Sequence, residues 1–501
     1  MVFSSLLFLF AYLPVTLLLY YNIPNIRYRN WVLFVVSLLF YGWGEPLYIL
    51  VMLASVTEAY VFGFFIAKHR ETNIRRARLY MVVSLAMNLA ALLFFKYCNF
   101  FIENLRLLPF LTDAIAPVEG LKLPIGISFY TFQIMSYTID LYRGQTDVQK
   151  NFVAFGTYVT LFPQLIAGPI VRYRDVDDQL MMRTETFDLF ASGVRRFTVG
   201  LSKKVLLGDA AAAYYEYFKA SDAFADSAAG AWMVMIFYTL HIYYDFSGYS
   251  DMAIGLGRMI GFRFLENFNY PYISKSITEF WRRWHMSLGT WFKEYVYIPL
   301  GGNRVGKRKQ YRNIAVVWFL TGFWHGANWN YILWGVYFGL ILMAEKTFLL
   351  GFLKKLPAFV QHIYALLLIG FGWIIFSFTD ASAGLSCFAS LFGIGTSTFC
   401  TPTIGYQIVR ALPLLAIGAV GATPLPKRLW DKLCTVDWTG IGAIREDGTE
   451  EPVRMQEEKS ALSVRGKIFA VLTTLGTFAL LLVCTAYLVD STFSPFLYFI
   501  F

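Results

Sequence analysis

Residues 313–344, NIAVVWFLTGFWHGANWNYILWGVYFGLILMA, contain no aspartate, glutamate, lysine or arginine. A transmembrane helix needs about 20 consecutive apolar residues, so this stretch is long enough to cross a bilayer. Other windows without these four residue types occur along the chain, at residues 1–26, 79–95, 151–171, 227–244, 356–379, 381–409, 411–426 and 468–489. With the shorter runs 31–44, 46–67 and 125–139, they predict roughly ten to twelve membrane helices in one domain covering residues 1–501.

The overall composition indicates the same class of protein. Of 501 residues, 57% are hydrophobic and 15% are charged, and the mean hydropathy is +0.52. A soluble domain averages about 45–50% apolar and about 25% charged residues. The sequence therefore predicts an all-α integral membrane protein in contact with the lipid bilayer. The five cysteines show neither zinc-ligand spacing nor a disulfide framework, so no metal is expected.

The net charge of +10 arises from 43 basic and 33 acidic residues. Basic residues gather in short loops between apolar runs, which follows the positive-inside rule and does not favour nucleic-acid binding. Arg27 and Arg29 flank one loop, and the basic cluster at residues 68–78 lies two spans later, on the same side. Both loops are therefore expected in the cytoplasm, with the N-terminus outside. A polar insert at about residues 427–467 is balanced in charge, so its charge does not indicate on which side of the membrane it lies.

Helix-breaking residues interrupt some apolar windows. Pro163 and Pro169 lie inside residues 151–171, and Pro124 precedes Gly126 at the start of another run. Irregular backbone at membrane depth is tolerated only where it is buried in protein or lines a wet cavity. These breaks predict re-entrant segments or a central cavity.

His325 lies in the apolar run TGFWHGANW, residues 321–329, at least a dozen residues from any Lys, Arg, Asp or Glu. An ionisable group at such a place costs about 2.5–3.5 kcal/mol and marks a functional site by default. Histidine can take and return a proton near neutral pH. Gly322 and Gly326 are expected to leave room beside the ring. Flanking tryptophans such as Trp324 are expected to line a binding site for an apolar substrate. A histidine that only hydrogen-bonds across a helix interface is the alternative.

A second candidate is the segment FWRRWHMSL, residues 280–288. As one helix it places Trp281, His285 and Leu288 on one face by i, i+4 and i+7 spacing, with Arg282 turned elsewhere. Such a helix suits the membrane interface, and an arginine pair beside a histidine can hold the phosphates of a cytosolic donor. An ordinary amphipathic interfacial helix fits the same pattern.

A third stretch contains Tyr244, Asp245 and Asp251, next to an apolar run that includes His241. Either acid is a candidate for orienting a histidine or binding a hydroxyl. Acids at the end of a span are more often simply solvated, so both interpretations stay open.

Several long blocks of the chain resemble the membrane-bound O-acyltransferases, in particular the bacterial branch that includes the alginate O-acetylation membrane protein and the peptidoglycan O-acetyltransferase. The blocks are residues 1–5, LPIGISFYTFQIMSYTIDLYRG at 123–144, FPQLIAGPIVR at 162–172, 244–304, 324–334 and 494–496. The resemblance runs nearly end to end and is weak at residues 381–467.

The resemblance implies a multi-helix bundle around a central tunnel in the bacterial cytoplasmic (inner) membrane. The family's catalytic histidine falls on His325 and its second polar motif residue on His285. We expect His325 to remove the proton of an acceptor hydroxyl and His285 to orient the donor or relay the proton. Asn328 or a tryptophan indole N–H is expected to stabilise the oxyanion. Further candidates for binding donor or acceptor are Trp324, Trp281, Arg282, Asp251 and Tyr244.

The expected function is O-acetylation of a cell-envelope polysaccharide with acetyl-CoA as donor and no bound cofactor. The acetyl group is expected to reach the polysaccharide acceptor directly or through a periplasmic acetyltransferase partner. Two alternatives stay open. One is D-alanyl transfer from a carrier-protein thioester to teichoic acid, and the other is a non-catalytic transporter in which His325 relays protons.

Overall fold

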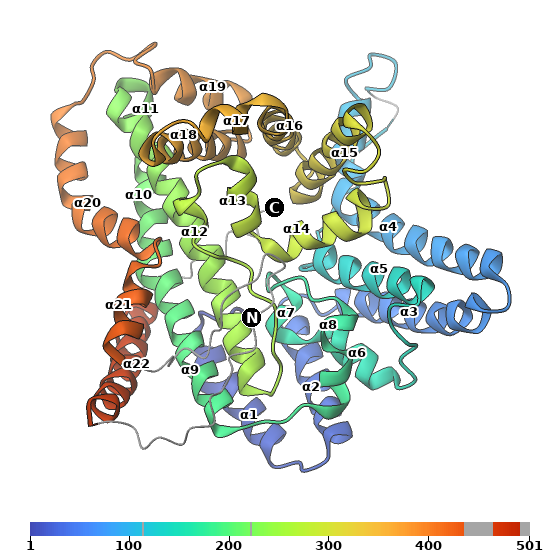
Figure 1. The fold of residues 1–501 in the computed structure, drawn as a ribbon. Coiled ribbons are helices and arrows are strands. Elements are labelled where there is room, and N and C mark those ends of the chain that lie inside the picture. Colours follow the sequence, from blue (N-terminus) through green and yellow to red (C-terminus); the bar gives the residue numbers. More distant parts are fainter. Residues whose placement is uncertain (113–114, 221–222, 435–463, 491–501) are drawn as a thin grey trace. The chain divides into compact units, whose positions relative to one another are not determined.

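The computed structural model describes residues 1–112, 115–220, 223–434 and 464–490. Within these ranges the regular structure is helical apart from one isolated bridge between Ser227 and Thr398, which confirms the all-α prediction (Figure 1). The chain clusters into two compact units, Met1–Val194 with Ala253–Phe264 and Arg195–Met252 with Leu265–Ile500. Most of the predicted polar insert lies outside the described residues.

The first unit contains a hairpin of two long apolar helices. These are α3 (Tyr48–Arg70) and α4 (Ile74–Leu105), which pack against each other and against α5 (Ile127–Arg143). The other helices of this unit are η1 (Phe8–Tyr12), α1 (Leu13–Tyr21), α2 (Ile26–Gly42), α6 (Phe152–Thr160), α7 (Phe162–Leu165), α8 (Tyr173–Met182) and the first half of α9 (Phe187–Ser202).

The apolar window 151–171 is broken, as its prolines predict. Helix α6 ends at Thr160, and Pro163 lies at the start of the single turn α7, where its missing N–H leaves no hydrogen bond unmade. Every residue from 153 to 171 is buried in protein. The irregular backbone is therefore tolerated because protein surrounds it.

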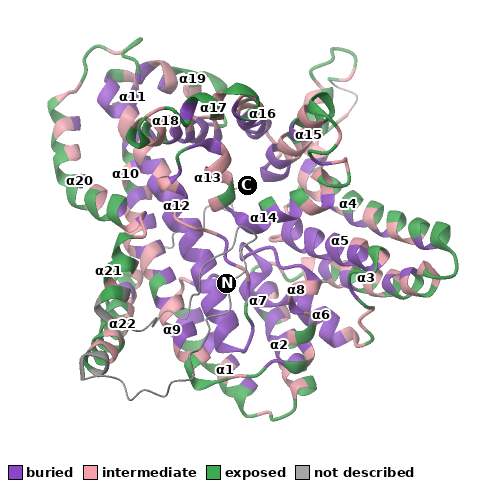
Figure 2. Ribbon diagram, viewed as in Figure 1, coloured by how far each residue is buried: buried purple, intermediate pink, exposed green. Residues whose placement is uncertain are grey.

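The second unit contains most of α12 (Ala228–Met259) and the helices that form the candidate site. These are α13 (Ile277–Arg283), α14 (Met286–Phe292), η4 (Lys293–Tyr297), α15 (Lys307–His325) and α16 (Trp329–Ala344). The others are η2 (Lys203–Gly208), α10 (Asp209–Ala220), α11 (Ala223–Asp226), η3 (Pro271–Ile273), η5 (Glu345–Leu349), α17 (Leu350–Leu353), α18 (Ala358–Ser377), α19 (Ala381–Ser390), α20 (Pro402–Gly421), α21 (Leu425–Cys434) and α22 (Val464–Asp490). Figure 2 shows α12 and α14 buried and α20 and α22 exposed.

Six helices of the described residues are long and apolar enough to cross a membrane, which makes the chain a multi-pass membrane protein. They span Tyr48–Arg70, Ile74–Leu105, Trp329–Leu353, Ala358–Ser377, Pro402–Gly421 and Ile468–Asp490. This number is lower than the ten to twelve expected from charge-free windows, because several windows fold into shorter or interrupted helices. The window 313–344, for example, is divided between α15 and α16 by a turn after His325.

Candidate active site

A cavity of about 910 Å³ lies within the second unit, lined mainly by α13, α14, η4, α15 and the loop before α15. Both histidines singled out in the sequence, His285 and His325, line it. Trp281 and Arg282 of α13 line it as well. The structure thus brings together two segments that are far apart in the sequence and that the sequence analysis treated as separate candidates.

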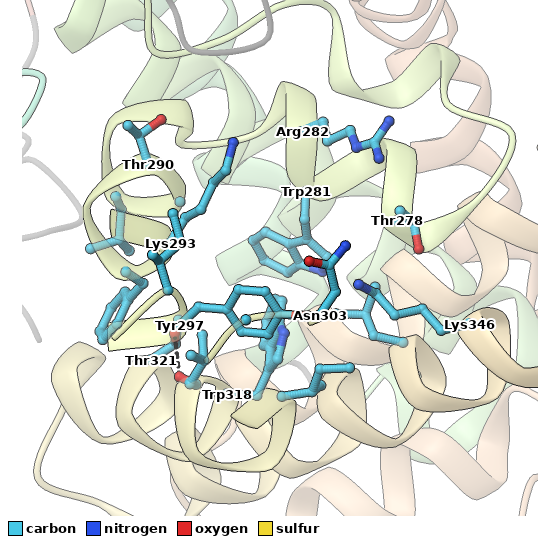
Figure 3. A pocket seen from close by; sticks show the side chains of 18 of the residues that line it. Thr278, Trp281, Arg282, Thr290, Lys293, Tyr297, Asn303, Trp318, Thr321 and Lys346 are labelled. Atoms are coloured by element: carbon cyan, nitrogen blue, oxygen red, sulfur yellow. Dashed lines mark hydrogen bonds between the residues drawn. The ribbon is translucent and has the colours of Figure 1, made fainter. Parts of the chain in front are cut away.

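The lining of the cavity is basic. Its charged side chains are Arg282, Lys293, Arg304 and Lys346, and none of the described residues that line it is acidic. Figure 3 shows Arg282, Lys293 and Lys346 spaced around the cavity, with Trp281 between them. A set of basic side chains attracts anionic ligands, and arginine and lysine are the usual partners of phosphate.

His325 is the last residue of α15, and its side chain is buried. The rings of Trp324, Trp334 and Phe376 surround the imidazole, with centroids 5.1, 5.0 and 5.4 Å from its own, all in edge-to-face geometry. Such contacts have a preferred orientation, so they hold the ring in place. A buried histidine held at the wall of a cavity is suited to accept a proton from a bound molecule.

The glycines near His325 serve helix packing. A Cβ atom on Gly322 would lie 2.4 Å from the carbonyl oxygen of Tyr331, and one on Gly335 would lie 2.3 Å from that of Trp318. A Cβ atom on Gly326 would lie 2.3 Å from the Tyr331 ring. The prediction that Gly322 and Gly326 leave room beside the His325 ring is therefore wrong, because Tyr331 of α16 occupies that space.

His285 lies at a break between two helices. Helix α13 ends at Arg283 and α14 begins at Met286, so the prediction of one continuous helix is wrong, although Trp281, His285 and Leu288 do line the same cavity. The φ angle of His285 is 46°. This left-handed conformation costs a non-glycine residue about 1–3 kcal/mol and persists only where surrounding contacts impose it.

Asn267, a residue that the sequence analysis did not single out, provides such contacts. Its backbone carbonyl accepts a hydrogen bond from the N–H of Met286 at 3.0 Å. Its side-chain Oδ1 lies 3.0 Å from His285 Nδ1 and 2.9 Å from Ser287 Oγ, and its Nδ2 donates to Ser250 Oγ of α12 at 3.0 Å. The only signal in the sequence is an amide placed among apolar and aromatic residues, where it needs partners.

His285 is neutral at physiological pH. Its side chain is almost completely buried, and the ring of Phe246 stands edge-on to it at 4.8 Å. Burial disfavours the charged form and lowers the pKa of His285 from about 6.5 to about 3. The ring of Trp324 lies 6.1 Å from that of His285, and 5.1 Å from that of His325.

Comparison with known proteins identifies the family. Residues 128–388 match the family model of the membrane-bound O-acyltransferases. Over the full length of both chains, the protein is 38% identical to one described as a probable alginate O-acetylase from Azotobacter vinelandii. It is 32% identical to the peptidoglycan O-acetyltransferase of Helicobacter pylori, over 80% of this chain and 81% of that one. The chain belongs to the membrane-bound O-acyltransferase family.

Membership in this family makes the protein an acyltransferase, and it confirms the resemblance found in the sequence. The alternative of a non-catalytic transporter is therefore set aside. The D-alanyl alternative also has a relative, the teichoic acid D-alanyltransferase of Bacillus subtilis, which is 30% identical over 46% of this chain and 61% of its own.

Other candidate residues of this acyltransferase are placed elsewhere. The carboxylate of Asp251 forms ion pairs with Arg196 at 2.6 Å and Lys203 at 2.7 Å. The hydroxyl of Tyr244 donates to the carbonyl of Gly418. Among the described residues, the candidates that do not line the cavity are Trp324, Asn328, Asp251 and Tyr244.

Glu345, which the sequence analysis also missed, anchors helix α13 to the end of α16. Its buried carboxylate accepts hydrogen bonds from the N–H of Ile277 at 2.7 Å and from the N–H and Oγ1 of Thr278 at 2.7 and 2.6 Å. The hydroxyl of Tyr364 donates to the same carboxylate at 3.1 Å. These bonds satisfy backbone donors in the first turn of α13 and so hold the helix that precedes His285.

We expect Glu345→Ala to lower the stability of the acyltransferase by about 3 kcal/mol, because the buried N–H of Ile277 and the partly buried N–H of Thr278 lose their acceptor at about 1–3 kcal/mol each. Thermal unfolding of the purified protein in detergent measures the loss. Glu71→Ala is the matched control, since that side chain is 85% exposed. Equal melting temperatures for the two variants would contradict the anchoring role.

Proposed function

We propose that this acyltransferase moves an acetyl group from cytosolic acetyl-CoA to a hydroxyl of a cell-envelope polysaccharide, directly or through a periplasmic acetyltransferase partner. The enzyme would act in the bacterial cytoplasmic membrane, with its N-terminus outside. The observation that carries the proposal is the basic cavity that joins His285 and His325. The names of two relatives, which refer to acetylation of alginate and of peptidoglycan, support an acceptor of the polysaccharide class.

In the proposed reaction, His325 acts as general base. The hydroxyl oxygen of the acceptor attacks the thioester carbonyl carbon while His325 takes the hydroxyl proton. The C–S bond then breaks, the thiolate of CoA receives a proton from His325, and the products are an ester and free CoA thiol. The imidazole ends the cycle neutral.

Trp281 is the candidate donor to the oxyanion. The oxygen of the attacked carbonyl becomes negative in the transition state and needs a hydrogen-bond donor already in place. The indole Nε1 of Trp281 is buried and makes no hydrogen bond within the described residues, and Trp281 lines the cavity with both histidines. Asn328, the other donor considered from the sequence, is not among the described lining residues.

The proposal is tested by measuring free CoA thiol released from acetyl-CoA by the purified protein in nanodiscs. Oligosaccharides of alginate and of peptidoglycan are supplied as acceptors, and a D-alanyl carrier-protein thioester is supplied as the competing donor. Acetyl transfer from acetyl-CoA to a polysaccharide hydroxyl is the expected result. Transfer only from the carrier protein would overturn the choice of donor and favour the D-alanyl alternative.

The basic lining predicts which part of the donor it recognises. We expect Arg282→Glu and Lys346→Glu each to raise the KM for acetyl-CoA about tenfold, since a hydrogen bond to a charged group contributes about 1.5–3 kcal/mol. The effect should disappear with S-acetyl-N-acetylcysteamine, a thioester donor that lacks the phosphates. Lys355→Glu is the control, because Lys355 is exposed and does not line the cavity. An equal rise in KM with both donors would contradict phosphate recognition.

A further inference from the structure

We propose that Asn267 is a positioning residue that holds His285 in the tautomer with its proton on Nδ1, so that Nε2 serves as a hydrogen-bond acceptor during acyl transfer. The tautomer follows from the contacts of the resting protein. Its consequence for the reaction rests on the proposed function.

The orientation of the Asn267 amide follows from its neighbours. The backbone N–H of Ser287 lies 3.3 Å from one end of the amide, and a backbone N–H can only donate, so that end is the oxygen Oδ1. The other end, Nδ2, lies 3.0 Å from Ser250 Oγ, which can accept. The two contacts agree, and the backbone N–H of Ser287 excludes the flipped amide.

The proton on the His285 ring is then assigned. Oδ1 of Asn267 has no hydrogen, and it lies 3.0 Å from His285 Nδ1. A hydrogen bond at this distance requires the hydrogen to be on Nδ1. A neutral imidazole carries a single N–H, and burial keeps His285 neutral. Nε2 therefore presents a lone pair.

This assignment decides between roles that the sequence left open for His285. An Nε2 with a lone pair accepts a hydrogen bond from a hydroxyl, and it can take a proton. It cannot donate to the thioester carbonyl or to the oxyanion. His285 therefore acts on the hydroxyl of the acceptor, and the oxyanion needs another donor.

Asn267 is itself held on several sides. Its amide is tied to Ser250 of α12, and its backbone carbonyl accepts from the N–H of Met286. The preceding residue, Glu266, forms an ion pair with Arg196 at 2.7 Å. A residue that fixes both the ring nitrogen and the left-handed backbone of His285 is suited to impose one geometry on it.

The tautomer can be read directly, because the chain has only five histidines. Nitrogen-15 NMR of histidine-labelled protein in nanodiscs, without donor, distinguishes protonated from unprotonated ring nitrogens. We expect the His285 signal to be that of a neutral histidine with protonated Nδ1, and it is identified by its disappearance in His285→Gln. The Nδ1 atoms of His69, His241 and His362 also lie against carbonyl oxygens, so their signals should remain in that variant. A wild-type His285 with its proton on Nε2 would overturn the inference.

Three variants separate positioning from a merely structural role. Asn267→Leu should shift the His285 signal away from the Nδ1–H form and lower kcat about 10²-fold, with a smaller change in the KM for acetyl-CoA. Asn267→Asp keeps an acceptor oxygen and should restore both the tautomer and most of the activity. Ser287→Ala removes a neighbouring donor to the same oxygen and should leave the tautomer unchanged.

The outcomes also distinguish this inference from the proposed function. An unchanged tautomer in Asn267→Leu would overturn the positioning role even if acetyl transfer is observed. The expected tautomers in a protein that transfers no acetyl group from any donor would confirm the positioning and overturn the proposed function instead. If Asn267→Leu does not fold, the wild-type tautomer and the Asn267→Asp variant still decide the question.

Discussion

His325→Ala should lower the rate of acetyl transfer by about 10²- to 10⁴-fold, which is the contribution expected of a general base. Without the imidazole, the acceptor hydroxyl has no group at this position to take its proton. The KM for acetyl-CoA should change little, because the basic residues that we assign to the donor are separate side chains of the same cavity. Release of CoA thiol in nanodiscs, with an acceptor oligosaccharide present, measures both quantities.

Removing the His325 ring also leaves a void among aromatic rings, so a second variant is needed. His325→Gln fills more of that space and still lacks a base of suitable pKa, and we expect the same loss of activity. His69→Ala is the control, because His69 does not line the cavity and its Nδ1 lies 2.9 Å from the carbonyl oxygen of Phe65 in its own helix. Rates near wild type in both His325 variants would contradict the assignment and would make His285 the candidate base.

Gly335→Leu should prevent correct folding of the α15–α16 pair and remove activity. Even the first carbon of a side chain would lie 2.3 Å from the Trp318 carbonyl and 3.1 Å from the Gly322 Cα. Both are backbone atoms, so the helices would have to separate near His325. The smaller change Gly335→Ala should already cost about 3 kcal/mol, the upper end of the usual cost of overpacking. Thermal unfolding and yield from the membrane fraction measure the effect.

Gly476→Ala provides the matched control for this prediction. Gly476 lies in α22, and a Cβ atom there would have no neighbour within 4 Å. The substitution should leave stability unchanged or raise it by up to about 1 kcal/mol through helix propensity. Similar melting temperatures for Gly335→Ala and Gly476→Ala would show that the two helices are not held together by this close approach.

The candidate site was partly predictable from the sequence. His325 stands out because an ionisable side chain in a long apolar window needs a reason to be there. His285 was also a candidate, but its backbone conformation was predicted wrongly. The 3.6-residue periodicity of its segment suggests a continuous helix, whereas the helix is broken at His285. The break at His285 depends on hydrogen bonds that Asn267 accepts, and no local pattern within residues 280–288 contains that information.

The partners of Asp251 could not be predicted from the sequence. Its position next to an apolar run left open whether it orients a histidine or is solvated, and the folded chain brings Arg196 and Lys203 to its carboxylate. The glycines near His325 likewise pack against α16 instead of leaving room beside the ring. In both cases the residue type indicates that the residue has a special role. The sequence does not reveal its partner, because the partner comes from another helix.

The sequence by itself determined that this protein is a helical membrane protein of the O-acyltransferase family, since apolar length and long matching blocks are properties of the chain alone. Only the tertiary structure decided that two histidines share one basic cavity and that Asn267 and Glu345 organise it. The physical reason is that a hydrogen bond acts over about 3 Å. Asn267 and His285 are 18 residues apart, and folding alone brings their atoms to that distance.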